Sequence, residues 1–172
     1  MDASLAGRLL VAAPLLLDPN FHRAVVLILH HDEHGAMGLI LNRRTEEPAE
    51  PYLADWGDFL ETDGLVHEGG PVERERALGL AAPTDLSNPS TGLTDFSAPP
   101  GPPAPIRIFA GYAGWGPGQL EFEIEQRSWL VLPPEPDDFL TLDPDRLWSR
   151  VLARQGGTVA MLAHYPMDPS LN

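Results

Sequence analysis

Two residue types are missing from this 172-residue sequence, cysteine and lysine. Without cysteine there can be no disulfide bond, no thiolate nucleophile and no cysteine-ligated zinc. Without lysine the phosphate-binding loop G-x-x-x-x-G-K-[ST] cannot be built. All eleven basic residues are therefore arginines.

Positive charge is also scarce, because 25 aspartates and glutamates oppose the eleven arginines and give a formal net charge of −14. Nucleic-acid affinity depends mainly on cationic contacts that release counterions from phosphates, so we expect no direct nucleic-acid binding. Anionic membrane surfaces are disfavoured for the same reason. An acidic partner would need a local positive spot on the surface.

Long apolar runs are lacking as well. The run Leu9–Leu17 is interrupted by Pro14 and is too short to span a bilayer. It follows the acidic Asp2, whereas a signal peptide needs a positively charged start and an uninterrupted apolar core. We interpret the run as a buried strand and expect a cytoplasmic protein with no membrane segment.

The composition suits one folded domain, since 43% of the residues are apolar and 21% are charged. Proline and glycine number 19 and 16, so loops should be abundant. Residues 83–105 hold seven of the prolines and show almost no periodicity, which is typical of a mobile loop. We predict a single domain over 1–172 with a mobile proline-rich loop at 83–105.

Apolar patterning predicts several short strands and a few helices. Strands are predicted at 8–13, 25–30, 39–41, 65–66, 77–82, 106–109 and 129–132. The second and third of these are close enough in sequence for an antiparallel hairpin. Helical spacing predicts a short helix at 53–60, and a longer one with Asp143 as N-cap, Pro144 in first position and an end at Gly156–Gly157. The pattern of 158–164 fits a strand or a short helix equally well.

The stretch IRIFAGYAGWGPGQLEFE at 106–123 is unusual because four glycines fall within eight residues. They follow a predicted strand and precede a predicted helix that carries Leu120 and Ile124 on one face. Glycine at this density indicates special backbone angles or the close approach of another group. We therefore predict that the backbone geometry requires Gly114 and Gly116.

The helix start in this stretch could hold a ligand. Unpaired N–H groups at a helix start can bind an anion, and Trp115 would then be partly exposed in a groove beside them. The alternative is a tight strand–helix corner in which Trp115 only packs. The glycine order matches neither of the standard nucleotide-binding motifs.

The segment GYAGWGPGQLE at 111–121 resembles the hallmark segment of the bacterial AlgH/YqgE family. Two further segments resemble this family in the same order, GRLLVAAPLLLDPNFHRAVVLILHHDEHGAMGLILNR at 7–43 and EGGPVERERALGL at 68–80. The resemblance implies a soluble α/β protein without an established enzymatic activity, although some members carry a transcriptional-regulator label. We expect an α/β fold with a mixed, partly antiparallel sheet core and a few flanking helices.

Catalytic and metal-binding patterns are weak. His30 and His31 in the tract HHDEH are adjacent at a strand end, so their side chains point to opposite faces, and the spacing H-E-x-x-H is absent. There is no G-x-S-x-G nucleophile elbow, and the carboxylates are too numerous to single out a general base. We expect no functional metal, no cofactor and no catalytic residue.

A binding site assembled from the loops 18–22, 68–72 and 111–120 is better supported, since such loops can gather at the strand ends of an α/β sheet. The candidate residues are hydrogen-bonding side chains, loop glycines and aromatic groups: Asp18, Asn20, Asn42, Gly69, Gly70, Pro71, Gly111, Tyr112, Gly114, Trp115, Gly116 and Gln119. The alternative is that Asp18 and Asn20 only shape turns.

Two functions remain open for this site. The first is a non-catalytic binding or regulatory protein that takes a small molecule or a protein partner. The second is an enzyme acting on a phosphorylated or nucleotide-like substrate at the helix start near 116–120, which would need an acid or base close to Gln119. The sequence names neither the ligand nor the oligomeric state.

Overall fold

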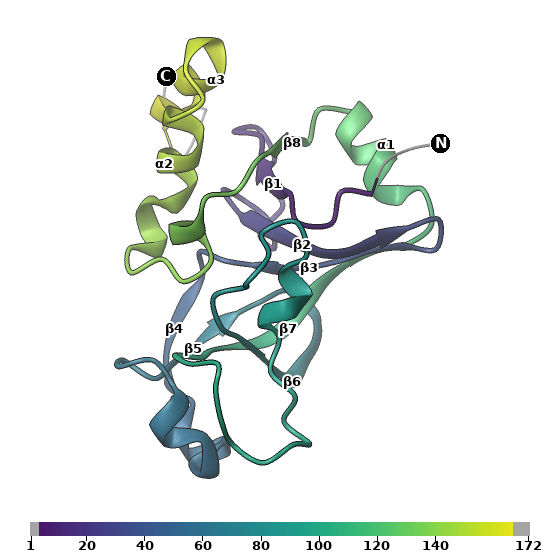
Figure 1. Ribbon diagram of the computed structural model, residues 1–172. Helices are drawn as coiled ribbons and strands as arrows, with labels where there is room; N and C mark the ends of the chain where they lie inside the picture. Colours follow the sequence, from purple (N-terminus) through teal and green to yellow (C-terminus); the bar gives the residue numbers. More distant parts are fainter. Residues whose placement is uncertain (1–3, 167–172) are drawn as a thin grey trace.

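The computed structural model describes residues 4–166, so both ends of the domain predicted over 1–172 lie outside the described range. One curled sheet of eight strands forms the core, in the order β4–β5–β7–β3–β2–β1–β8 with β6 paired to β7 (Figure 1). The strands are β1 Leu9–Ala12, β2 Val25–Asp32, β3 Gly35–Ile40, β4 Arg44–Pro48, β5 Leu65–Glu68, β6 Val72–Leu80, β7 Arg107–Trp115 and β8 Trp129–Leu132. Only β5 and β7 pair in parallel, which confirms the predicted mixed, partly antiparallel sheet.

The apolar runs explain the centre of the sheet. Residues Val25–Leu29 of β2 and all four residues of β1 are buried on both faces. One face carries a core that includes Leu147 and Trp148, and the other carries a core that includes Trp115 and Leu120. A strand with apolar residues on both faces is stable only between two such cores.

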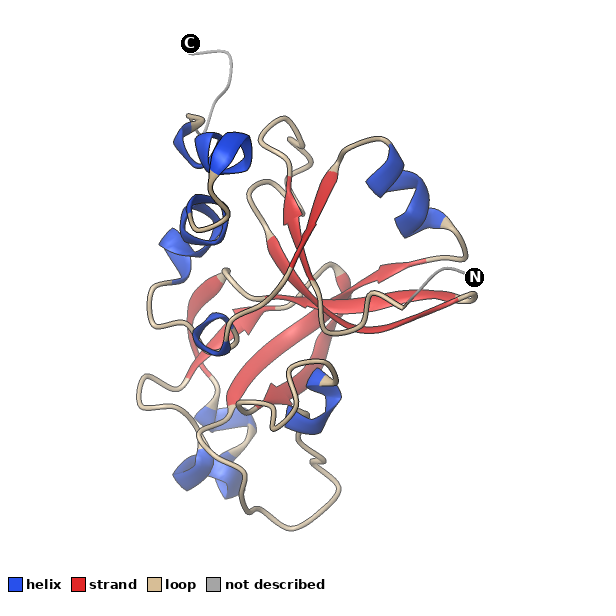
Figure 2. Ribbon diagram, turned by 45° about the horizontal axis from the view of Figure 1, so that its top comes forward, coloured by secondary structure: helices blue, strands red, loops and turns tan. Residues whose placement is uncertain are grey.

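Three α-helices flank the sheet: α1 Gln119–Glu125, α2 Leu147–Ala153 and α3 Gly157–Met161. The helix α1 and the pair α2–α3 stand on opposite sides of β8 in both views (Figure 2). Short 3₁₀-helices complete the chain: η1 Glu50–Tyr52, η2 Ala54–Phe59, η3 Pro89–Gly92, η4 Pro136–Asp138, η5 Pro144–Arg146 and η6 Leu162–His164. None of the helices among residues 4–166 is long and apolar enough to cross a membrane.

The strand β7 joins the two halves of the sheet. Its first half pairs with β5 and β6, and its second half pairs with β3. The change of partners occurs at Gly111, whose φ of +75° is left-handed. A Cβ there would lie 2.5 Å from the Gly70 carbonyl oxygen, so only glycine fits.

The prediction that the backbone geometry requires Gly114 and Gly116 is wrong, because a Cβ at either position would have no atom closer than 3.5 Å. Gly114 lies inside β7, and only residues 116–118 turn toward α1. Gly114 and Gly116 do not have left-handed φ angles, whereas Gly111 and Gly118 do. Backbone pairing with β3 extended the strand through glycines that local propensity assigns to a turn.

Three other segments refine the prediction. Residues 158–164 are helical, which settles the choice left open by their pattern. Asp143 precedes η5 but makes no side-chain capping bond. Within 83–105, Leu86 and Leu93 pack on the core and Phe96 stacks edge-on against Trp56 at 5.1 Å. The mobility of this loop stays a prediction.

Candidate functional site

The first predicted loop, 18–22, is fixed by an internal hydrogen bond and by hydrogen bonds from Arg43. The Asn20 N–H donates to Asp18 Oδ1 at 2.8 Å, which closes a turn. Arg43 donates to the carbonyl oxygens of Pro19, Asn20 and His22 at 3.1, 2.6 and 3.0 Å. The loop is thus fixed from the end of β3 by one guanidinium.

Asn42 holds the strand that follows this loop. Its Oδ1 accepts from the Val25 N–H at 2.9 Å, and its Nδ2 donates to the Arg23 carbonyl at 2.8 Å. These bonds keep Arg23 at a φ of +58°, a left-handed angle that is uncommon for a residue with a side chain. The Arg23 guanidinium carbon lies 4.3 Å over the Trp148 ring, and its Nη2 donates to the Tyr165 carbonyl at 2.9 Å.

The second loop, around Gly69, Gly70 and Pro71, packs directly on β7. The Gly69 N–H donates to the Ala110 carbonyl at 2.9 Å. A Cβ on Gly70 would lie 2.1 Å from the Tyr112 carbonyl carbon, so the two backbones touch. These glycines therefore permit close strand contact.

Arg74, in β6 just after this second loop, contacts the first loop. Its Nη2 donates to Asn20 Oδ1 at 3.4 Å, while its Cα lies against Gly111. The structure thus brings together the loop 18–22, the loop 68–72 and the start of the third loop at Gly111 and Tyr112.

The remainder of the third loop lies under α1, where Trp115 contacts Phe21 of the first loop. Trp115 is only 6% exposed, and its ring lies 6.2 Å from the Phe21 ring and 6.0 Å from the Trp129 ring. The prediction that Trp115 is partly exposed in a groove is wrong, because these aromatic side chains enclose it beneath the helix.

The start of α1 is occupied by its own side chains. Gln119 Oε1 accepts from the Gly116 N–H at 3.0 Å, and Gln119 Nε2 donates to Glu123 at 2.9 Å. Glu123 also accepts from the indole N–H groups of Trp115 and Trp129, at 3.1 and 3.0 Å. An acid does lie beside Gln119, but three donors of the fold already occupy it.

Ion pairing separates the arginines into two groups. Six have a carboxylate within 4.0 Å: Arg44, Arg76, Arg107, Arg146, Arg150 and Arg154. Among residues 4–166, five have none: Arg8, Arg127 and three that lie near the predicted loop site, Arg23, Arg43 and Arg74. These three, here called the arginine cluster, connect with the loop 18–22 or flank it.

Two members of the arginine cluster line a cavity of about 250 Å³. Its walls come from the ends of β2 and β3 and from α2, with Asp145 as the one acidic lining residue: His22, Arg23, Asn42, Arg43, Pro144, Asp145, Trp148 and Ser149. Burial lowers the pKa of Arg23 and of Arg43. The sequence alone did not point to these arginines, because an arginine without a carboxylate nearby can be recognised only from contacts in the folded protein.

A buried polar pair lies outside the predicted loops. Arg107 and Glu61 form an ion pair at 2.7 Å, and His67 is buried nearby against Phe109. Burial, and then the charge of Arg107, lower the pKa of His67 to about 4. Neither His67 Nε2 nor Arg107 Nη1 has a hydrogen-bond partner among the described residues.

The histidine tract around β2 makes local pairs. His30 Nε2 pairs with Asp32 at 2.8 Å, whereas His31 pairs with Glu121 of α1 and accepts from the Leu5 N–H at 2.9 Å. Within the described range no three metal-ligating side chains converge. The expectation that there is no functional metal stays a prediction.

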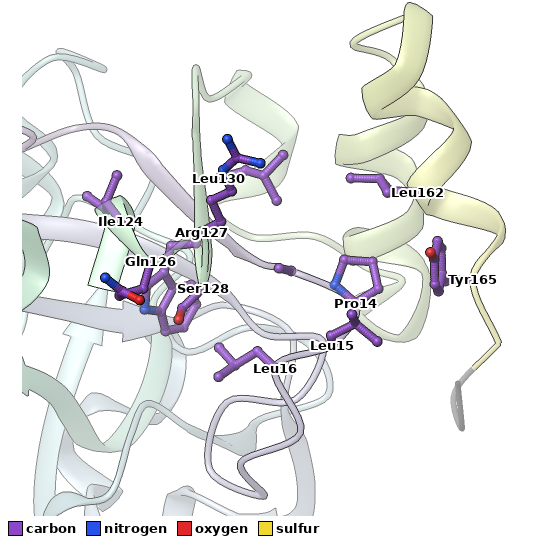
Figure 3. Close-up of a pocket in the computed structure, with 12 residues that line it drawn as sticks. Pro14, Leu15, Leu16, Ile124, Gln126, Arg127, Ser128, Leu130, Leu162 and Tyr165 are labelled. Carbon is purple, nitrogen blue, oxygen red and sulfur yellow. The ribbon is translucent and has the colours of Figure 1, made fainter. Parts of the chain in front are cut away.

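Two further cavities contain none of the twelve predicted site residues. One of about 310 Å³ lies between η1 and β6 and has Arg74 among its lining residues. The other, of about 690 Å³, lies between the end of α1 and the C-terminal helices (Figure 3).

Comparison with known proteins gives consistent matches over nearly the whole chain. The family described as AlgH-like matches residues 9–160. A UPF0301 protein of Streptomyces coelicolor is 50% identical over 186 aligned positions, which cover 99% of this chain and 96% of that protein. A UPF0301 protein of Thermobifida fusca is 43% identical, with 98% and 96% covered.

Solved structures show the same architecture. The crystal structure of protein DIP2367 from Corynebacterium diphtheriae superposes with a TM-score of 0.81 at 27% identity and covers 96% of this chain and 94% of that one. The solution structure of AlgH from Pseudomonas aeruginosa gives a TM-score of 0.67 at 27% identity, with 96% of each chain covered.

Proposed function

The chain belongs to the AlgH-like family, and on that premise we propose that it is a non-catalytic binding protein whose ligand is a small anion bearing a carboxylate or phosphate. The observation that carries the proposal is the arginine cluster. In a chain of net charge −14, the guanidinium groups of Arg43 and Arg74 both bond to Asn20 of the predicted loop, and Arg23 lines the same cavity as Arg43.

Electrostatics favour an anion at this place. Arg23 and Arg43 both line the 250 Å³ cavity, and burial removes part of their hydration. An anion would restore the lost interactions, since guanidinium groups bind carboxylates and phosphates through paired hydrogen bonds. The stacking of Arg23 on Trp148 and the carbonyl contacts of Arg43 orient both groups before a ligand arrives.

The residues at the start of α1 give little support to the enzyme hypothesis. Glu123, the acid beside Gln119, accepts hydrogen bonds from three side chains and serves the aromatic packing. A general base needs room to accept a substrate proton. The enzyme hypothesis at residues 116–120 therefore has less support than the binding hypothesis at the arginine cluster.

The class of partner follows from the net charge. A surface of net charge −14 with one small cationic cluster suits a small anion better than a phosphate backbone, so direct nucleic-acid binding is not part of this proposal. We also propose a cytoplasmic location for this protein.

Calorimetric titration with citrate and with inorganic phosphate tests the proposal. Wild type should bind at least one of the two. Arg74→Gln and Arg23→Asn should each weaken the affinity by roughly tenfold or more, because a charge-assisted hydrogen bond contributes about 1.5–3 kcal/mol. Asparagine is chosen at position 23 because it tolerates the left-handed backbone angle.

Arg146→Gln is the matched control, since Arg146 is 83% exposed and lies outside the cluster. It should bind like wild type. If neither anion binds wild type, or if all three variants lose affinity equally, the arginine cluster is not an anion site.

A further inference from the structure

The strand β8 has an open edge. Among the described residues it pairs only with β1, and Pro133 ends it after four residues. The Ala13 N–H donates to the Ser128 carbonyl at 2.9 Å, which sets the alternation of the ladder. The N–H and C=O of Val131 therefore point away from β1, toward the free side.

An apolar groove lies beside the start of β8, where its lining includes Trp129 and Leu130, the residue next to Val131. Figure 3 shows Pro14 and Leu15 facing Tyr165, with Leu16 below them, Leu162 above Tyr165 and Leu130 of β8 above Pro14. The volume is about 690 Å³. Leu15 is 68% exposed, so the groove keeps apolar surface in water.

The groove has a single charged lining residue, Arg127. Within the range 4–166 no carboxylate lies within 4.0 Å of it. Its backbone is left-handed, at a φ of +62°. A cation that no carboxylate of the described residues pairs, beside an apolar groove in a chain of net charge −14, suits an occupant that brings a carboxylate.

We propose that this groove binds an extended peptide of a partner protein, which pairs with the free edge of β8. Backbone bonds to Val131 hold the peptide, apolar side chains at alternate positions fill the groove, and an acidic residue meets Arg127. This site is separate from the arginine cluster and adds a protein partner to the proposed function.

A second copy of the chain fits less well than a peptide. It would bring another net charge of −14 and a second Arg127 to the same edge. A peptide can be nearly neutral apart from the one carboxylate that Arg127 needs.

Selection of random 12-residue peptides displayed on phage, with the whole chain as bait, tests the proposal. The enriched peptides should alternate apolar and polar residues and contain aspartate or glutamate. Val131→Pro removes the outward N–H while leaving the bonds to β1, because proline is accepted on edge strands. This change should lower the affinity for the best peptide at least tenfold. Val131→Ala, which keeps the N–H, should lower that affinity less than threefold.

Charge is tested in the same way. Arg127→Asn should weaken peptides that contain the carboxylate and leave their amide versions unchanged, and Arg76→Asn, a change at an exposed arginine outside the groove, should have no effect. Failure to enrich any pattern, or equal binding to Val131→Pro with an unchanged melting temperature, would overturn the proposal. So would a dimer of wild type that Val131→Pro dissociates, since a second copy would then be the occupant.

Discussion

At the scale of single residues, the two glycines of β7 should behave very differently. Gly111 has a left-handed φ, and a Cβ there would meet the Gly70 carbonyl oxygen at 2.5 Å. Gly111→Ala should therefore lower the free energy of unfolding by about 3 kcal/mol or more, because strain and a backbone clash add up. At Gly114 the nearest atom to a Cβ is 3.5 Å away, so Gly114→Ala should cost less than about 1 kcal/mol. Urea denaturation of both variants measures this difference, and equal losses would contradict it.

Trp115 provides a second residue-scale prediction. Because its ring is enclosed by Phe21 and Trp129, Trp115→Ala should cost about 3–5 kcal/mol of unfolding free energy. Phe122→Ala on the adjacent helix is the control, since Phe122 is 60% exposed, and it should cost less than about 0.5 kcal/mol. Denaturant titration decides, and a loss below about 1.5 kcal/mol at Trp115 would place the ring outside the core.

His67 should make stability depend on pH. Its pKa falls to about 4 in the folded protein, mainly through burial, so between that value and about 6.5 the unfolded chain binds more protons. Stability should therefore decrease as the pH falls through this window, by roughly 1.3 kcal/mol between pH 7 and pH 5.5.

The comparison with His67→Leu isolates this contribution. The variant keeps an apolar side chain against Phe109 and has no titrating group, so its loss between pH 7 and pH 5.5 should be smaller by the same amount. Urea denaturation at the two pH values measures this difference. Both pH values lie above the isoelectric point, which is near 4.6. Identical pH profiles for the two proteins would show that His67 is not kept neutral by burial.

At the residue scale, the sequence predicted the turn at 18–22 but not which residues the arginines contact. Asp18 and Asn20 belong to the predicted loop because their side chains favour turns, and in the structure that loop is contacted by Arg74 of β6, just after 68–72. Which arginines have no carboxylate nearby depends on contacts between residues far apart in the chain, such as Arg74 with Asn20. No local pattern carries that information.

At the scale of elements, the segment 83–105 combines a packed part and an exposed part. Phe96 contacts Trp56, so Phe96→Ala should cost about 1.5–3 kcal/mol. Pro100 is exposed, and if the loop is mobile, Pro100→Ala should change stability by less than about 0.5 kcal/mol, because the segment is then equally free in the folded and unfolded chains. Thermal denaturation of both variants is the measurement, and a clear loss at Pro100 would show that the loop is ordered there.

Strands and helices with a clear apolar sequence pattern could be predicted from the sequence. The strands at 25–30 and 129–132 and the helix after Asp143 coincide with β2, β8 and η5–α2, since their patterns need no knowledge of neighbours. The continuation of β7 to Trp115 depends on pairing with β3, and the helical state of 158–164 on packing beside α2. In both cases contacts with distant residues determine the secondary structure, and the local sequence pattern does not.

At the scale of the whole molecule, metal should play no part in stability. The nearest approach to a metal-binding pattern is HHDEH, where His30 and His31 pair with Asp32 and Glu121 instead. Treatment with a chelator such as EDTA should leave the melting temperature unchanged, because only the loss of a ligand selective for the folded state lowers it. A drop that added zinc or calcium reverses would contradict this.

The position of β7 also bears on how the chain is made. The strands β3, β5 and β6 all precede β7 in the sequence, and among the described strands β7 is the one that pairs with both halves of the sheet. During synthesis the apolar β2–β3 hairpin therefore leaves the ribosome long before the strand that covers its edge. Native pairings between such distant segments form slowly, and nascent chains with uncovered strands tend to aggregate. The sheet can close only after residue 115 has emerged, so until then the β3 edge is exposed to other chains and to chaperones.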